Sequence, residues 1–158
     1  MNEPVLVGIA QIVVAKAPER ICCMGLGSCV AVFLYDPMGR IGGVVHALLP
    51  RAPRDAKVRG KYADTAVKAL LDEMISKGAR RDQLRAKLVG GAQMFPNLNI
   101  KVADIGKENV EEAKKALKGL GIRLAAEDTH GTRGRSATFD LENGRVSIST
   151  AFSDSHFI

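Results

Sequence analysis

The sequence predicts an α/β (α+β) fold: a single layered domain in which mixed β-sheets pack together and helices lie on the outside. Short runs rich in Val and Ile recur along the chain, two longer stretches carry apolar residues at a 3.6-residue period, and turn residues separate them. The chain has 158 residues, of which 46% are hydrophobic and 25% charged, so it is long enough to bury one core. We expect one domain over residues 1–158, with its core at about 5–150.

Strands account for most of the first fifty residues. The stretch PVLVGIAQIVVA, residues 4–15, predicts a strand that is interrupted near residues 8–11, and a short strand is expected at 20–24. CVAVFLYD, residues 29–36, predicts a third strand that the turn DPMGR closes, and IGGVVHALLP, residues 41–50, predicts its antiparallel neighbour. The last two runs are apolar on both faces, so we expect both strands to be buried.

Two helices and further strands are expected in the remainder of the chain. YADTAVKALLDEMISKG, residues 62–78, carries an apolar stripe at helical spacing, and Gly78 fits its end. The other predicted elements, in chain order, are a basic loop at 51–61, a strand within 84–95 that runs into a Gly-Gly turn, a helix at about 107–119 and strands at about 121–127, 133–140 and 145–150. We expect the last eight residues to be loosely held.

The net charge of +6 is concentrated in two basic stretches. RAPRDAKVRGK, residues 51–61, and KGARRDQLRAK, residues 77–87, contain few acidic residues. Such stretches are typical of solvated loops and helix ends, and the alternative is docking onto an acidic protein surface. Aromatic residues make up only 4% and Trp is absent, so stacking platforms for single-stranded nucleic acid are lacking. We expect no nucleic-acid partner.

Neither a secretory leader nor a membrane span is predicted. The start of the chain, MNEPVLVGIA, carries an acid and a proline where a leader would carry basic residues. No apolar run reaches the length of a membrane span. We therefore expect a cytoplasmic protein without membrane insertion, whose three cysteines are free thiols.

Cys29 and His46 are the candidate catalytic pair. Cys29 follows the glycine turn GLGS at the start of a strand, and His46 lies 17 residues later on the predicted antiparallel neighbour, so the two side chains can come within reach of each other. An imidazole beside a thiol can take its proton and activate it as a nucleophile. Gly25 and Gly27 allow a sharp bend that leaves backbone N–H groups free to face a substrate oxygen. The alternative is a packing cysteine and a core histidine.

A zinc site and a phosphate loop are disfavoured. Cys22, Cys23, Cys29 and His46 would supply three thiolates and an imidazole. However, the chain has no C-x-x-C pair, and adjacent cysteines on a strand point to opposite faces. No Gly-Lys-Ser/Thr follows GLGSC or GGAQM, which excludes a Walker-type site. We therefore expect neither a metal nor a cofactor.

Six stretches, in this order, resemble the chemoreceptor glutamine deamidase family, CheD: GLGSCVAV with Cys29, VVHALLP with His46, KYADTAV, KLVGGAQMF, IGKENVEEAKKALKGLGI and AEDTHGTRGRS. The resemblance covers about residues 5–150. It implies an amidohydrolase that converts selected glutamines on the cytoplasmic helices of chemotaxis receptors to glutamate and releases ammonia. It also implies a CheC-type phosphatase as a partner and a fold similar to the catalytic domain of the cytotoxic necrotizing factors.

Two alternatives to this enzyme stay open. One is a CheD-like module that binds receptor helices or regulates a CheC phosphatase with little catalysis of its own. The other is an unrelated thiol hydrolase on a similar fold, and the KYADTAV and GGAQMF stretches favour the family over it.

The resemblance also implies roles for single residues. Cys29 matches the nucleophile and His46 the general base. Cys23 occupies the position of the family's orienting threonine, but a thiol is a weak acceptor, so a backbone carbonyl near residue 23 is the alternative. The N–H groups of Ser28 and Cys29 are expected to hold the oxyanion. If His46 activates Cys29, the thiol should have a depressed pKa and react with iodoacetamide below pH 7.

The basic loop gains a role from the same resemblance, because receptor cytoplasmic helices are generally acidic. We expect the loop to steer docking of substrate or partner through five side chains: Arg51, Arg54, Lys57, Arg59 and Lys61. The alternative is that these side chains are merely solvated.

Overall fold

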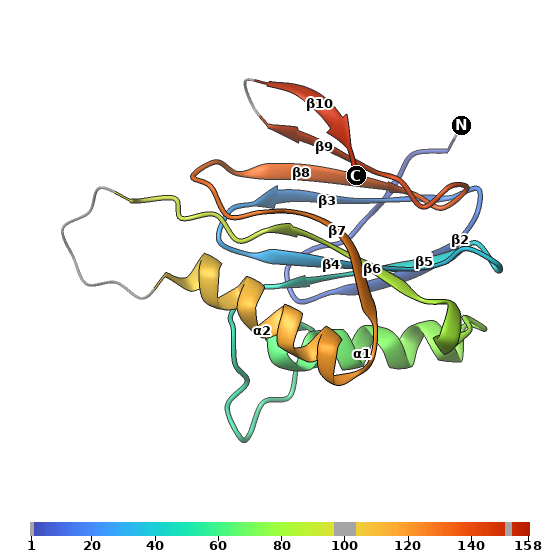
Figure 1. The fold of residues 1–158 in the computed structure, drawn as a ribbon, viewed down its shortest axis with the longest axis horizontal. Helices are drawn as coiled ribbons and strands as arrows, with labels where there is room; N and C mark the ends of the chain where they lie inside the picture. The colour runs from blue at the N-terminus through green and yellow to red at the C-terminus, as the bar shows by residue number, and fades with distance from the viewer. Residues whose placement is uncertain (1, 97–103, 151–152) are drawn as a thin grey trace.

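The computed structural model describes residues 2–96, 104–150 and 153–158, and these form two five-stranded sheets and two helices (Figure 1). The strands are β1 Val5–Leu6, β2 Ile12–Lys16, β3 Arg20–Leu26, β4 Val30–Asp36, β5 Ile41–Ala47, β6 Arg85–Gly90, β7 Arg123–Thr129, β8 Arg135–Asp140, β9 Val146–Thr150 and β10 Ser153–Phe157. The helices are α1 Ala63–Ser76 and α2 Ile105–Gly119, with single 3₁₀ turns at η1 Arg59–Lys61 and η2 Arg81–Gln83. In the described part of the chain, no helix combines the length and apolar character needed to cross a membrane.

The elements stack in three layers. The central sheet has the strand order β2-β5-β4-β6-β7, and the outer sheet has the order β1-β3-β8-β9-β10. Helices α1 and α2 cover the face of the central sheet that points away from the outer sheet, as Figure 1 shows. The pairs β1–β3 and β6–β7 are parallel and the other pairs are antiparallel. The predicted fold class of packed mixed sheets with helices outside is therefore confirmed.

The central sheet is buried on both faces. Val30 and Val32 of β4 face the helices, whereas Ala31 and Phe33 face the outer sheet, because successive side chains of a strand alternate between its faces. A strand that is covered on both sides needs apolar residues at every position. This requirement explains the continuous apolar runs that predicted β4 and β5, and the antiparallel pairing of these two strands is confirmed.

Two glycines let the layers approach β5 closely. A Cβ atom on Gly42 would lie 2.3 Å from Cδ2 of Leu141, on the outer-sheet side. A Cβ atom on Gly43 would lie 2.8 Å from Cδ1 of Leu70, on the helix side. Both distances are well below van der Waals contact, so the glycine pair in IGGVV is a packing requirement of the three-layer arrangement.

Both predicted helices are present. Helix α1 ends at Ser76, and Gly78 follows with a φ of +98°, a backbone conformation that glycine adopts without strain. Helix α2 begins at Ile105, two residues earlier than the apolar stripe indicates. The reason is a cap: Oδ1 of Asp104 accepts a hydrogen bond from the backbone N–H of Lys107 at 3.1 Å.

The expectation of a loosely held C-terminus is wrong for the residues that the structure describes there. Strand β10 pairs antiparallel with β9, and the backbone of Ile158 exchanges two hydrogen bonds with Val146. Nζ of Lys87 also donates to the carbonyl of Ile158 at 2.6 Å. The sequence SDSHF of β10 contains one large apolar residue, so only long-range pairing makes it a strand. Residues 151–152 lie outside the described residues.

Candidate active site

Cys29 lies where the chain crosses from one sheet to the other. Strand β3 of the outer sheet ends at Leu26, and β4 of the central sheet begins at Val30, so only Gly27, Ser28 and Cys29 make the connection. The short connection requires a sharp bend, which accounts for the glycines of GLGSC. It also places the thiol at the entrance of the layer between the sheets, where it is 7% exposed.

The Gly-Gly turn after β6 holds this connection in place. The backbone N–H of Gly91 donates to the carbonyl of Cys29 at 2.8 Å, and that of Ala92 donates to the carbonyl of Gly27 at 2.9 Å. Gly90 has a φ of +115°, and a Cβ atom there would lie 2.3 Å from the carbonyl oxygen of Cys29. The stretch KLVGGAQMF therefore contributes a backbone clamp for the candidate nucleophile.

His46 shares a sheet face with Cys29. It lies opposite Ala31 on the antiparallel β4–β5 pair, and Ala31 is two residues from Cys29. Positions two apart on a strand point to the same face, so Cys29 and His46 are diagonal neighbours in the layer between the sheets. His46 is 3% exposed. Within the described residues, the Cys29 thiol and the His46 imidazole form no hydrogen bond with each other.

Cys23 reaches the same place from the opposite sheet. Its Sγ atom lies 3.4 Å from Nδ1 of His46, and both groups are buried. Nε2 of His46 is also buried, and it has no hydrogen-bond partner within the described part of the chain. The structure thus brings Cys23, Cys29 and His46 together, with Nδ1 occupied by a thiol and Nε2 available to a further group.

Burial keeps these groups uncharged in the resting protein. It raises the pKa of the Cys29 thiol, and the backbone of Cys29 itself acts in the opposite direction. Burial lowers the pKa of His46, partly offset by the backbone of Val7. Burial and the two neighbouring thiols Cys22 and Cys29 raise the pKa of Cys23 to about 12. The neutral thiol and the neutral imidazole are therefore the stable forms at neutral pH.

This result corrects the expectation that His46 depresses the pKa of Cys29. An ion pair of thiolate and imidazolium would have to form where water is largely excluded, and the loss of hydration outweighs the attraction in the resting structure. The backbone of Val7 favours the His46 imidazolium, and the N–H of Val7 donates to the carbonyl of Cys22 at 3.0 Å. The orientation of His46 by a carbonyl near residue 23 stays a prediction.

Two backbone N–H groups beside the thiol have no carbonyl partner. In the residues that the structure describes, the N–H groups of Ser28 and Cys29 donate to no backbone carbonyl, and the backbone of Cys29 acts on its own thiol. Both lie on the connection that carries the thiol. Their role as oxyanion donors stays a prediction.

Cys22 does not join the other cysteines. It lies on the opposite face of β3, where Oγ1 of Thr138 lies 3.7 Å from its Sγ atom. The four groups of the disfavoured zinc site thus do not converge. The two remaining histidines are exposed: His130 lies in a turn, and Nε2 of His156 lies 2.5 Å from Oδ2 of Asp128.

The basic loop lies beside the site, but two of its five expected docking residues are already paired within the chain. Arg51 forms salt bridges with Glu108 and Glu112 of α2, and Arg59 forms one with Asp72 of α1. The other three form no salt bridge within the described residues: Arg54, Lys57 and Lys61.

Backbone hydrogen bonds tie the end of this loop to the site. The carbonyl of Lys61 accepts the N–H of Leu48, two residues beyond His46. The backbone of Gly60 packs against the carbonyl of Ala10, and the N–H of Ala10 donates to the carbonyl of His46. The loop therefore ends at the same end of the central sheet as the candidate pair.

An apolar hollow of about 270 Å³ reaches His46 from the surface. Three large exposed apolar side chains, Leu6, Ile9 and Met24, stand at its rim. Its other lining residues are Val7, Gly8, Cys22, Gly25 and His46. The sequence gives no indication of these rim residues, because single exposed apolar residues are common on protein surfaces.

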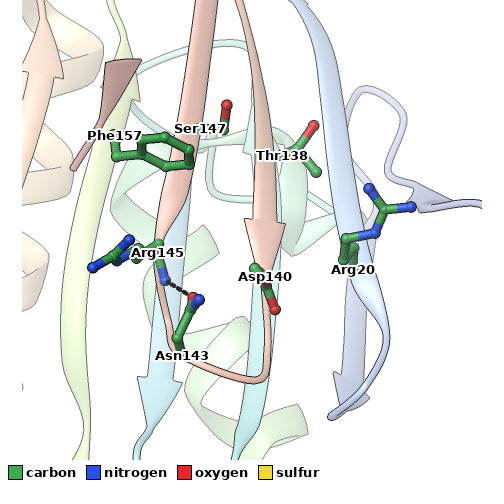
Figure 2. Close-up of a pocket in the computed structure, with 7 residues that line it drawn as sticks. All are labelled: Arg20, Thr138, Asp140, Asn143, Arg145, Ser147 and Phe157. Carbon is green, nitrogen blue, oxygen red and sulfur yellow. Dashed lines mark hydrogen bonds between the residues drawn. The ribbon is translucent and has the colours of Figure 1, made fainter. Parts of the chain in front are cut away.

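Figure 2 shows a second hollow, of about 400 Å³, which lies on the outer sheet. Among the residues drawn there, the backbone N–H of Arg145 donates to Oδ1 of Asn143 at 2.9 Å. The hollow is lined by Arg20, Thr138, Asp140, Asn143, Arg145, Ser147 and Phe157. Thr138 pairs with Cys22 and shares its outward face, so this hollow lies on the side of the sheet away from the Cys23–His46 contact.

A thiol and an imidazole at the edge of a two-sheet core are the groups that cysteine hydrolases use. Comparison with known proteins shows to which family the chain belongs. The family described as CheD chemotactic sensory transduction matches residues 48–150, and the chain belongs to this family. The chemoreceptor glutamine deamidase CheD of Thermotoga maritima is 45% identical over 143 residues, which cover 90% of this chain and 89% of that protein.

A second relative agrees with this assignment, and one solved structure shares the fold. The probable chemoreceptor glutamine deamidase CheD of Pyrococcus abyssi is 48% identical over 149 residues, covering 92% of this chain and 91% of that protein. Among solved structures, the hypothetical protein YfiH of Bacillus licheniformis superposes with a TM-score of 0.50 at 14% identity, over 77% of this chain and 49% of that one. The latter likeness concerns the fold alone. The similarity to the cytotoxic necrotizing factor domain stays a prediction.

Proposed function

We propose that the protein is a protein-glutamine deamidase that acts on chemotaxis receptors. It converts selected glutamine side chains on their cytoplasmic helices to glutamate, consumes water and releases ammonia. The observation that carries the proposal is the convergence of Cys29 and His46 in one buried layer, in a chain whose relatives are named as chemoreceptor glutamine deamidases.

The proposed reaction is acyl transfer through a thioester. His46 Nε2 takes the proton of Cys29 as the sulfur attacks the amide carbon, and the backbone N–H groups of Ser28 and Cys29 hold the oxyanion. The imidazolium then returns its proton to the departing nitrogen, which leaves as ammonia. A water molecule, deprotonated by His46, hydrolyses the thioester to glutamate and restores the thiol.

The neutral resting state sets the timing of the first proton transfer. Because burial favours the uncharged thiol and imidazole, the proton leaves Cys29 only when the sulfur attacks. The negative charge then passes to the substrate oxygen, where the two N–H donors stabilise it. His46 acts as a general base in this scheme, a role that contributes roughly 10²–10⁴-fold to such rates.

For Nε2 to accept this proton, the other ring nitrogen must carry hydrogen, so Nδ1–H faces the Cys23 sulfur. Sulfur accepts hydrogen bonds weakly. We propose that a backbone carbonyl contributes more than Cys23 to orienting and stabilising the imidazole. The backbone of Val7 favours the protonated form of the ring, which supports this proposal.

The substrate helix is proposed to dock across the apolar hollow and the basic loop. Leu6, Ile9 and Met24 would contact apolar side chains that flank the target glutamine, and the hollow leads to His46. The unpaired basic residues of the loop would attract the acidic face of a receptor helix. A CheC-type phosphatase is proposed as a second partner, because the family resemblance implies one. Since the proposed targets are cytoplasmic receptor helices, we also propose that the protein acts in the cytoplasm.

Mass spectrometry of a receptor cytoplasmic fragment tests the function. Each Gln→Glu conversion adds about 1 Da at a single site, and ammonia release measures the rate independently. Cys29→Ala and His46→Ala should abolish both signals while leaving the fold intact. Ser149→Ala is the control, because Ser149 is an exposed residue of β9, a strand that carries none of the proposed site residues, and it should retain wild-type activity. Receptor binding by the wild type without any mass change would favour the binding module instead.

A further inference from the structure

Asn109 of α2 bridges the two backbone segments that carry the candidate pair. Its side chain is fully buried. Nδ2 donates one hydrogen bond to the carbonyl of Ser28 at 2.9 Å and another to the carbonyl of Leu48 at 3.0 Å. Ser28 directly precedes Cys29, and Leu48 follows His46 by two residues. One amide group thus connects the segment of the nucleophile to the segment of the base.

The amide of Asn109 uses its two donors but not its acceptor, and this pattern favours a positioning role. Both hydrogens of its amide are used, whereas Oδ1 is buried without a partner among the described residues. A buried, unpaired carbonyl oxygen is unfavourable. A residue that only filled space at this point of α2 would be apolar and would avoid this cost. The two donors are the property that an apolar residue cannot supply.

Close packing of α2 makes this bridge rigid. A Cβ atom on Gly91 would lie 2.3 Å from Cγ2 of Val110, and one on Gly106 would lie 2.4 Å from the carbonyl oxygen of Ala92. The helix therefore rests directly on the Gly-Gly turn that also binds the carbonyl of Cys29. Asn109 extends from a helix whose position relative to the thiol is already restricted.

We propose that Asn109 is a positioning residue that sets the separation and orientation of Cys29 and His46. This inference rests on the proposed function for its kinetic consequence. The structural consequence is independent of the proposed function. Without the Asn109 bridge, the connection that carries Cys29 would loosen at the Ser28 carbonyl and expose the thiol.

Asn109→Leu tests the inference, because leucine has a similar size and no donor. Leu117→Ala is the matched control: Leu117 is buried on the same helix, and its truncation destabilises α2 without touching either carbonyl. We expect Asn109→Leu to lower kcat at least about tenfold with KM changed less than about threefold. The control should keep kcat within about twofold at a temperature where both variants are folded by circular dichroism.

Alkylation by iodoacetamide gives a readout that needs no deamidase activity. Asn109→Leu should alkylate Cys29 at least about fivefold faster than wild type, with Cys22 as the internal reference. If Asn109→Leu does not fold, Asn109→Ser retains one donor and is expected to show intermediate effects. An unchanged kcat and an unchanged Cys29 rate in a folded variant would overturn the proposal. Absence of wild-type deamidation would instead overturn the proposed function, while the alkylation rates still report on Asn109.

Discussion

The Cys29 thiol and the His46 imidazole are both uncharged in the resting protein, and their pKa values set the pH range over which kcat/KM is constant. The base is active when His46 is unprotonated, and burial lowers its pKa, so the acid limb of kcat/KM should lie below about pH 6.5. Burial raises the pKa of Cys29, so the alkaline limb should lie above about pH 8.5. We expect kcat/KM to be flat between these limits in a pH series with a receptor fragment.

A required free thiolate would give a different profile. The rate would then rise about tenfold per pH unit between pH 7 and 8.5, and such a rise would contradict the neutral pair. Alkylation of the resting protein provides a control that involves no substrate. Cys29 should react more slowly than the half-exposed Cys22 below pH 7.

Cys23 tests which group orients His46. If a backbone carbonyl does most of this work, Cys23→Ala should lower kcat less than about tenfold, equivalent to about 1.4 kcal/mol. Cys23→Thr should retain or raise activity, because a hydroxyl accepts the Nδ1–H hydrogen bond better than a thiol does. Steady-state kinetics under reducing conditions measure both variants. A loss of a hundredfold or more in Cys23→Ala would show that the side chain itself orients the ring.

Among the secondary-structure elements, we expect the Gly-Gly turn after β6, which binds the Cys29 carbonyl, to be sensitive to substitution. Gly90→Ala places a Cβ atom against the Cys29 carbonyl in a backbone conformation with positive φ. We expect a loss of about 1–3 kcal/mol in the free energy of unfolding and a lower kcat, measured by urea denaturation and by ammonia release.

Gly119→Ala is the matched control for this substitution. A Cβ atom there, at the last residue of α2, meets nothing within 4 Å. The change should be neutral or slightly stabilising, because alanine is the better helix former. Equal effects of the two substitutions on kcat would contradict the clamp.

Elements whose burial follows from their own sequence were predictable. Strand β4 is apolar from Val30 to Leu34, β5 is apolar except for His46, and α1 and α2 carry an apolar stripe at helical spacing. Strand β10 was not predictable from its own sequence, because it becomes a strand only by pairing with β9. Local patterns describe how one segment is buried, whereas distant pairings depend on the assembled molecule.

The same distinction separates the parts of the site. Cys29 and His46 were predictable because a glycine turn and a short hairpin connection fix their relative position locally. The Cys23–His46 contact depends on the packing of two sheets, and only the family resemblance indicated it. Asn109 had no sequence signal, since a single amide within a helix does not reveal which distant carbonyls it contacts.

In the whole molecule, the candidate site and a structural turn lie at opposite ends of the central sheet. The turn between β4 and β5 lies at the far end, where Asp36 accepts hydrogen bonds from the backbone N–H groups of Met38, Gly39 and Arg80. The candidate pair, the apolar hollow and the basic loop gather at the opposite end. A substrate that carries negative charge would therefore meet positive charge at the end where the thiol lies.

This arrangement predicts how salt affects substrate capture. A triple variant that replaces Arg54, Lys57 and Lys61 with Ala should raise KM for a receptor fragment and flatten its dependence on ionic strength, because screened attraction between separated charges is lost. Its kcat should stay within about twofold, since none of these side chains touches the pair. Initial rates between about 50 and 300 mM salt, a range over which screening changes substantially, provide the measurement.

The matched control removes the same charge from the far end of the central sheet. Lys77, Lys118 and Arg123 are exposed, lie at or just beyond the ends of α1 and α2, and are remote from the pair. Replacing them with Ala changes the net charge of +6 by the same three units but leaves the local field at the site in place. The control should therefore keep the wild-type salt slope. If both triple variants flatten the slope equally, net charge rather than the loop steers docking, and if neither does, the loop is merely solvated.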